Sequence, residues 1–86
     1  MVSTVGHRFV LPGRVSKCCG MYCVYVPKYL AEVYHGKKLR VTVAGTSITF
    51  LSTIDKAGDR YLLRIPAKIG KLLHGREFMF EVEVLE

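Results

Sequence analysis

Two features that define other protein classes are missing from this sequence of 86 residues. No segment approaches the roughly 18 to 20 uninterrupted apolar residues that a membrane-spanning helix needs. Residues 1–7 also lack the basic segment followed by an apolar stretch that is typical of a secretory signal. We therefore expect a soluble, cytoplasmic protein without a membrane partner.

Groups that perform catalysis or bind metals are also scarce. The chain has three histidines and seven acidic residues, and no spacing among them suggests a nucleophile with its base or a pair of catalytic carboxylates. Cys18, Cys19 and Cys23 have no fourth cysteine or nearby histidine to complete a zinc site. We therefore expect no enzyme activity, no cofactor and no metal. The cysteines are expected to be thiols, or to form one bond to another chain.

Positive charge is what the sequence has in excess. Thirteen Lys and Arg residues against seven Asp and Glu residues give a net charge of +6. Residues 1–43 hold seven basic residues and one acid, Glu32, whereas residues 44–86 hold six of each. The excess therefore belongs to the first half of the chain. It indicates either a basic surface that serves solubility or a surface that binds an anionic partner.

The chain also contains an internal repeat, because it aligns with itself without a gap at an offset of 39 residues. The first copy covers about residues 6–44 and the second about residues 45–84. Apolar residues at alternating positions correspond between the copies, and so do residues that define turns and helix ends. The identical pairs are Gly6/Gly45, Lys17/Lys56, Tyr22/Tyr61, Pro27/Pro66, His35/His74, Gly36/Gly75 and Val43/Val82.

Each copy predicts two strands, a short helix and a third strand. In the second copy, residues 48–54 and 61–65 have the β-branched and aromatic residues and the two-residue period of half-buried strands, with a turn at 55–59. A third strand is predicted over residues 76–84. The first copy repeats this pattern with strands over 9–15, 22–26 and 39–43 and a helix over 27–34.

The helix of the second copy is predicted over residues 67–73. Pro66 suits the first turn of a helix, and Ile69, Leu72 and Leu73 lie on one face at helical spacing. Glycine just past the last apolar residue is typical of a helix end, so Gly75 closes it. His74, like His35 in the first copy, is expected to cap the helix end or to pack there.

Neither copy is large enough to fold alone, because a helix of about two turns is marginal by itself and three strands leave open edges. Two copies can bury their apolar faces against each other. We therefore predict a single domain over residues 1–86 of the mainly β class. The predicted architecture is a closed six-stranded barrel made of two ββαβ repeats related by a pseudo-twofold axis, with two short helices.

The sequence DRYLLRIPAKI at residues 59–69, followed by LLHGREFMFEV at residues 72–82, resembles a known family signature. The order of strand, Ile-Pro, amphipathic helix, glycine and strand is similar to AbrB-type transition-state regulators and MazE-like antitoxins, and residues 22–43 are a looser version. The tandem arrangement over residues 6–84 resembles the cradle-loop barrels, which include double-psi barrels, RIFT barrels and the swapped-hairpin AbrB fold.

The resemblance to AbrB-type regulators implies DNA binding through basic residues on the first hairpin and at the helix start. Lys17 and Lys56 match the basic hairpin position, and Lys71 matches a helix position. Cys23 and Leu62 stand where those regulators have an arginine. The RIFT barrels also include CTP-dependent riboflavin kinases, whose long insertions and acidic metal ligands have no counterpart here.

These observations lead to one functional prediction. Basic residues flank the first hairpin and open the third strand of the first copy, so on a barrel they can form one face, with Tyr25 and Tyr29 available to stack on bases. We predict a small regulator, monomeric or homodimeric, that binds DNA, or alternatively RNA, through its phosphates. The predicted contact residues are Arg8, Arg14, Lys17, Lys37, Lys38, Arg40, Lys56 and Lys71. The alternatives are a non-catalytic module that binds a nucleotide or flavin, and one that binds another protein.

Overall fold

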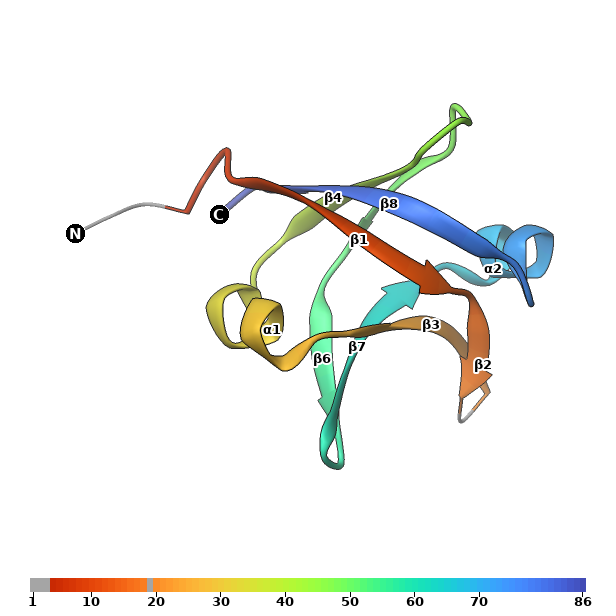
Figure 1. The fold of residues 1–86 in the computed structure, drawn as a ribbon, viewed down its shortest axis with the longest axis horizontal. Coiled ribbons are helices and arrows are strands. Elements are labelled where there is room, and N and C mark those ends of the chain that lie inside the picture. The colour runs from red at the N-terminus through yellow and green to blue at the C-terminus, as the bar shows by residue number, and fades with distance from the viewer. Residues whose placement is uncertain (1–3, 19) are drawn as a thin grey trace.

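The strands and helices follow the order of the repeat. The computed structural model describes residues 4–18 and 20–86. Its elements, labelled in Figure 1, are β1 (Arg8–Arg14), β2 (Ser16–Cys18), β3 (Met21–Val26), α1 (Lys28–Tyr34), β4 (Leu39–Val43), β5 (Thr49–Ser52), β6 (Ile54–Ala57), β7 (Arg60–Ile65), α2 (Ala67–Leu73) and β8 (Glu77–Val84). Both helices lie where the sequence predicted them. They stand at opposite ends of the molecule (Figure 1).

The strands form two antiparallel sheets of four strands each. Sheet A has the order β1-β8-β4-β5, and sheet B has the order β2-β3-β7-β6. The fold is therefore mainly β with two short helices, as the sequence predicted. The prediction of one closed six-stranded barrel is wrong, because within the described residues there are two sheets and neither closes on itself.

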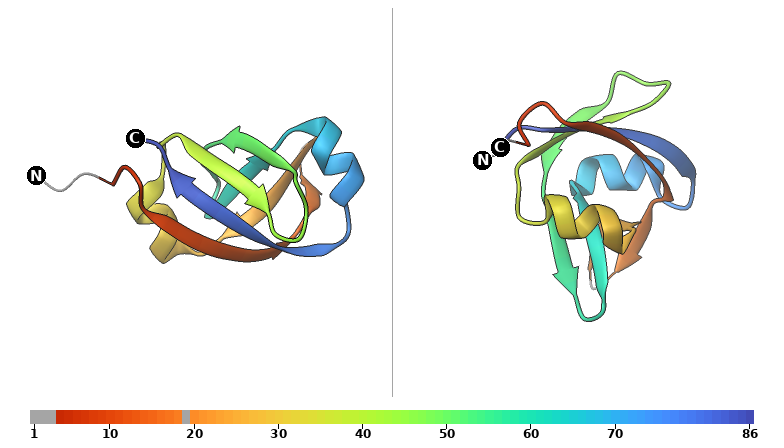
Figure 2. Two further views of the ribbon diagram at one scale, coloured as in Figure 1. Left: turned by 90° about the horizontal axis from the view of Figure 1, so that it is seen from above. Right: turned by 60° about the vertical axis from the view of Figure 1, so that its left-hand side comes forward.

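The number of strands exceeds the prediction because two segments each pass from one sheet to the other. The chain leaves β1 at Val15 and continues as β2 in sheet B, and it leaves β5 at Thr53 and continues as β6. Strands that bend from one sheet into another form the corners of orthogonally packed sheets. At the first corner β1 passes close to β3, because a Cβ atom at Gly13 would collide with Val24. Figure 2 shows how the two sheets and the helices enclose the interior.

The turn predicted at residues 55–59 is shorter than expected. Strand β6 extends through Ala57, which leaves Gly58 and Asp59 as the turn before β7. The pairing of Lys56 with Tyr61 and of Ala57 with Arg60 holds these polar residues in an extended conformation. Cross-strand hydrogen bonding here overrides the low strand propensity of the sequence.

The pairing register repeats at the offset of 39 residues. Val10 of β1 pairs with Glu81 of β8. Adding 39 to the first position and subtracting 39 from the second gives Thr49 and Thr42, which pair between β5 and β4. The β3–β7 and β4–β8 ladders each join a strand of one half to the corresponding strand of the other half, so the same shift leaves their registers unchanged. The two halves therefore pair in the same way, and central ladders join one half to the other in both sheets.

The core lies between the two sheets and holds the residues at alternate strand positions. On β8, Phe80, Val82 and Val84 are buried and Phe78 is partly buried, in keeping with the alternation of apolar residues along this strand. Cys23 and Leu62 are also buried but lie outside this core cluster. They have the opposite strand parity to the core residues Val24 and Leu63, so they lie on the outer face of sheet B. Two positions where the AbrB-type regulators have arginine are therefore packed here.

The helices differ from the prediction in which residues they bury. Leu73 is buried and Ile69 packs on the core, but Leu72 is 70% exposed, so it does not share their face. The third inward residue is Gly70, which contacts the Tyr22 ring so closely that a Cβ atom there would collide with it. No helix within the described part of the chain is long and apolar enough to span a membrane.

Candidate functional site

The outer face of sheet A carries three of the predicted contact residues. Arg8 on β1 and Arg40 on β4 flank Glu83 on β8, with nitrogen-to-oxygen distances of 3.6 and 3.2 Å. Arg14 at the end of β1 lies 3.5 Å from the carboxylate of Glu77. The arginines of the first half therefore face acids of the second half, and this face is not a continuous basic surface.

A different group of cations gathers where α2 meets the β2–β3 hairpin. The Lys17 ammonium lies 5.7 Å from the centre of the Tyr22 ring, and this ring contacts the His74 ring edge to face at 5.5 Å. Because Tyr22 also packs on Gly70, it joins the hairpin of the first half to the helix of the second half. We call this region the α2 end, and its basic residues are Lys17, Lys68, Lys71 and Arg76.

The basic residues of the α2 end have no acidic partners in the part of the chain that the structure describes. Lys68 and Lys71 are exposed on α2, on the side away from the buried Leu73. Arg76 is placed beside the β1–β2 bend, because its carbonyl accepts a hydrogen bond from the Val15 N–H at 3.1 Å. Within the described residues, none of the four basic residues at the α2 end forms an ion pair. Their charges are therefore available to an anionic partner.

The opposite end of the molecule, the α1 end, is built in the same way but carries less charge. Lys56 lies 5.9 Å from the centre of the Tyr61 ring, which contacts the His35 ring at 5.6 Å. The repeat offset places Lys56, Tyr29, Glu32 and Lys37 at the positions that correspond to Lys17, Lys68, Lys71 and Arg76. One acid and one tyrosine thus replace two lysines. The two histidines pack against tyrosines of the opposite half, as expected for a packing role.

The predicted contact residues are therefore divided among several surfaces. Arg8, Arg14 and Arg40 lie on sheet A, Lys17 and Lys71 at the α2 end, and Lys37 and Lys56 at the α1 end. The eighth, Lys38, lines a separate groove. Tyr25, which was expected to be exposed and available for stacking, is 43% exposed but has the Arg60 guanidinium 5.1 Å from its ring centre. Tyr29 is exposed on α1.

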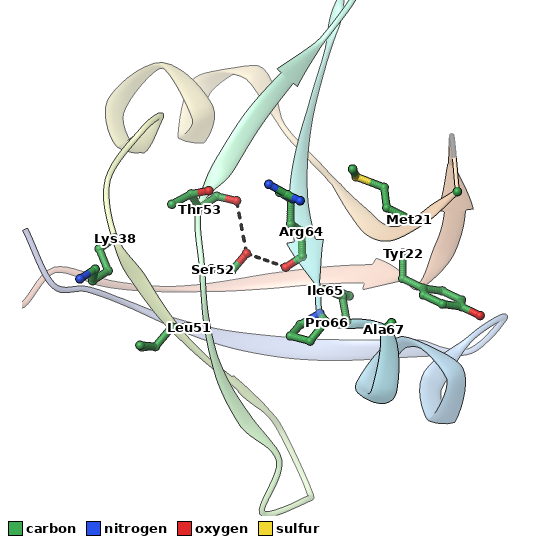
Figure 3. Close-up of a pocket in the computed structure, with 11 residues that line it drawn as sticks. Met21, Tyr22, Lys38, Leu51, Ser52, Thr53, Arg64, Ile65, Pro66 and Ala67 are labelled. Atoms are coloured by element: carbon green, nitrogen blue, oxygen red, sulfur yellow. Dashed lines mark hydrogen bonds between the residues drawn. The ribbon is translucent and has the colours of Figure 1, made fainter.

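The groove has a volume of about 530 Å³ and lies between the start of β4, the β5–β6 bend, the end of β7 and the β2–β3 turn (Figure 3). Lys38 and Arg64 are the charged residues of its lining. Ser52 lies between them, because it pairs with Leu39 next to Lys38 and its hydroxyl donates to the Arg64 carbonyl at 2.5 Å. The other lining residues are Gly20, Met21, Tyr22, Leu51, Thr53, Ile65, Pro66 and Ala67.

Sequence reasoning missed three cations that the fold brings to these surfaces. Lys68 and Arg76 belong to the second half of the chain, which has no net charge, so the charge distribution did not point to them. Arg64 has the outward parity of its strand, and only the fold brings it next to the β5–β6 bend. A comparison of the two copies could have found Lys68 and Arg76. They occupy the positions in the second copy that correspond to Tyr29 and Lys37, which were functional candidates in the first.

Only Cys23 of the cysteine motif has a described side chain, and it is buried. Cys19 and the side chain of Cys18 lie outside the part of the chain that the structure describes. Among the residues that the structure describes, no group of three or more His, Cys, Asp or Glu side chains is arranged to hold a metal ion. Comparisons with protein-family models, curated proteins and solved structures find no match for this chain.

Proposed function

We propose that this protein binds DNA through contacts between its α2 end and the phosphates. The observation that carries the proposal is the gathering of Lys17, Lys68, Lys71 and Arg76 at one end of the molecule, where none of them has an ion-pair partner among the described residues. Nucleic acids are the partners best matched to such a surface, because each neutralised phosphate releases condensed counterions. Contacts of this kind position a protein on the backbone without reading its sequence.

The arrangement of the α2 end favours this role over a purely structural one. Tyr22 has Lys17 on its ring and rests on α2, so the hairpin and the helix present their cations from one packed unit. The corresponding α1 end has the same tyrosine, lysine and histidine contacts. Packing alone therefore does not require the extra lysines at the α2 end. Their presence supports binding of an anion there.

We also propose that the chain is related to the cradle-loop barrels, and through them to the AbrB-type regulators. The repeated order of two strands, Pro, short helix and strand supports this relation, as do the two ladders that join one half to the other. The bends at Val15 and Thr53, where the chain passes from one sheet to the other, are the third supporting feature.

The salt dependence of DNA binding tests the proposed function. We expect fluorescence anisotropy with a labelled DNA duplex to show binding at about 50 mM salt, with a slope of log K against log salt of about −3 to −4 for four phosphate contacts. The double variant Lys68→Ala/Lys71→Ala removes two exposed side chains and keeps good helix formers. It should reduce the magnitude of the slope by about 2 and weaken binding to all DNA sequences alike.

The double variant Lys37→Ala/Lys56→Ala is the matched control, because it removes the same charge from the α1 end. Equal losses in the two double variants would overturn the assignment to the α2 end. Absence of binding at about 50 mM salt would overturn the function itself. Tighter binding to an RNA duplex than to DNA of the same sequence would replace DNA by RNA as the partner.

A further inference from the structure

The groove beside Lys38 has a second copy in the molecule that differs from it in a specific way. A smaller cavity of about 300 Å³ is lined by Tyr25, Val26, Lys28, Asp59, Arg60 and Tyr61. Each of these residues corresponds, at the offset of 39, to a residue that lines the larger groove. The repeat therefore builds the same depression twice, and the side chains decide which of the two is larger.

In the smaller copy, side chains interact with one another at positions whose counterparts in the larger groove do not. The Arg60 guanidinium lies over the Tyr25 ring, 5.1 Å from its centre. In the larger groove, Met21 corresponds to Arg60, and Arg64 corresponds to Tyr25. Arg14 and Glu77 form an ion pair at 3.5 Å. Their counterparts beside the larger groove are Thr53 and Lys38. In the larger groove the corresponding position holds Lys38, which has no ion-pair partner among the described residues.

We propose that the larger groove binds a small phosphomonoester that carries an apolar or aromatic group. Lys38 and Arg64 both line the groove, and Ser52 lies between the backbone segments that carry them. An anion in the groove is therefore exposed to two positive charges. The Nε atom of Arg64 faces Asp55 at 3.5 Å, which leaves the terminal nitrogens of the guanidinium as donors. A phosphomonoester has a charge of about −1.5 to −2 at neutral pH, which matches two cations better than a single carboxylate does.

The rest of the groove determines what the phosphate is attached to. Met21, Ile65 and Pro66 give the side of the groove away from Lys38 an apolar surface, and Tyr22 lies beside them (Figure 3). A volume of about 530 Å³ lies within the range of roughly 300–1,000 Å³ that is typical of small-molecule sites. A ligand the size of a mononucleotide therefore fits both the charge and the surface.

Titration with AMP, adenosine and inorganic phosphate tests this site. In amide-resolved NMR we expect AMP to shift the signals of residues 52–53, 64–65 and 67, and both adenosine and phosphate to bind more weakly than AMP. Lys38→Ala should weaken AMP binding at least about tenfold, as the loss of a charge-assisted contact predicts. The matched control is Lys28→Ala, which removes the same charge from the smaller copy and should leave AMP affinity unchanged.

Several results would overturn the proposal. They are the absence of AMP-induced shifts in the groove, equal affinity for AMP and adenosine, and an equal effect of Lys28→Ala and Lys38→Ala. Thermal unfolding of each variant shows whether it is folded, and Arg64→Lys provides a second test that keeps the charge while removing the guanidinium fork. Arg64→Lys should weaken AMP binding, and unchanged affinity would remove Arg64 from the site.

This site is independent of the proposed function, because its charged residues are not those of the α2 end. The Lys68→Ala/Lys71→Ala variant should retain AMP binding while losing DNA affinity, and Lys38→Ala should do the reverse. Failure of one proposal is thereby distinguished from failure of the other. Displacement of AMP by a DNA duplex that still requires Lys68 and Lys71 would overturn the independence of the two sites.

Discussion

Glu83 is expected to stabilise sheet A by neutralising two arginines that come from the other half of the chain. Its carboxylate lies 3.6 Å from Arg8 and 3.2 Å from Arg40, and its side chain is 27% exposed. The variant Glu83→Gln keeps the size and strand position of the side chain but removes the charge. Arg8 and Arg40 then flank an uncharged residue, so their mutual repulsion is no longer offset.

The structure sets the magnitude of this effect. Exposed ion pairs contribute about 0.2–1 kcal/mol each, and the two arginine side chains are 77% and 51% exposed. Glu83→Gln should therefore lower the free energy of unfolding by about 1 kcal/mol at low salt. For a chain of this size that corresponds to a fall in Tm of about 4–8 °C.

Denaturation by urea or heat at low salt and at about 1 M salt provides the assay. Glu81→Gln is the matched control, because Glu81 lies on the same face of β8 and, among the described residues, has no ion-pair partner. The control should change stability by less than about 0.5 kcal/mol. The effect of Glu83→Gln should nearly vanish at about 1 M salt, where the screening length is about 3 Å. Equal destabilisation by both variants, or a Glu83→Gln effect that salt does not change, would refute the reasoning.

Two further predictions concern the glycines that the halves use to pack together. Gly70→Ala should destabilise the protein by about 1 kcal/mol, measured from the midpoint of urea denaturation. The added Cβ would meet the Tyr22 ring, and this overpacking outweighs the better helix propensity of alanine. A stabilised variant would show that Tyr22 moves aside without cost. Gly75→Ala should lower stability by about 1–2 kcal/mol because φ is +81° there, whereas Gly75→Asn should lower it less. Equal effects of Ala and Asn at this position would show that backbone conformation is not the cause.

The distribution of charge has a different explanation from the one that the sequence favours. The excess of cations in the first half favours a basic face made by that half. In the structure, Arg8, Arg14 and Arg40 stand opposite Glu77 and Glu83 of β8, so part of the asymmetry serves pairing between the halves. The sequence does not reveal this, because it contains no information on which strands of the two copies lie side by side.

Local patterns in the sequence were sufficient to locate most of the secondary structure. Pro66 and Gly75 mark the limits of α2, and the alternation of β8 places Phe80 inward, because these signals depend on neighbours within a few residues. The repeat was also visible in the sequence, and the pairing register follows its offset.

Only the tertiary structure decided where strands change sheets and which cations meet. At the bend beside Val15, Gly13 of β1 packs closely against Val24 of β3, and no local residue pattern encodes such a contact. Lys17 and Lys71 are 54 positions apart, and the packing of Tyr22 on Gly70 brings the hairpin and the helix that carry them together. The sequence by itself therefore determined the elements and their repetition, whereas long-range packing determined the two sheets, the α2 end and the groove beside Lys38.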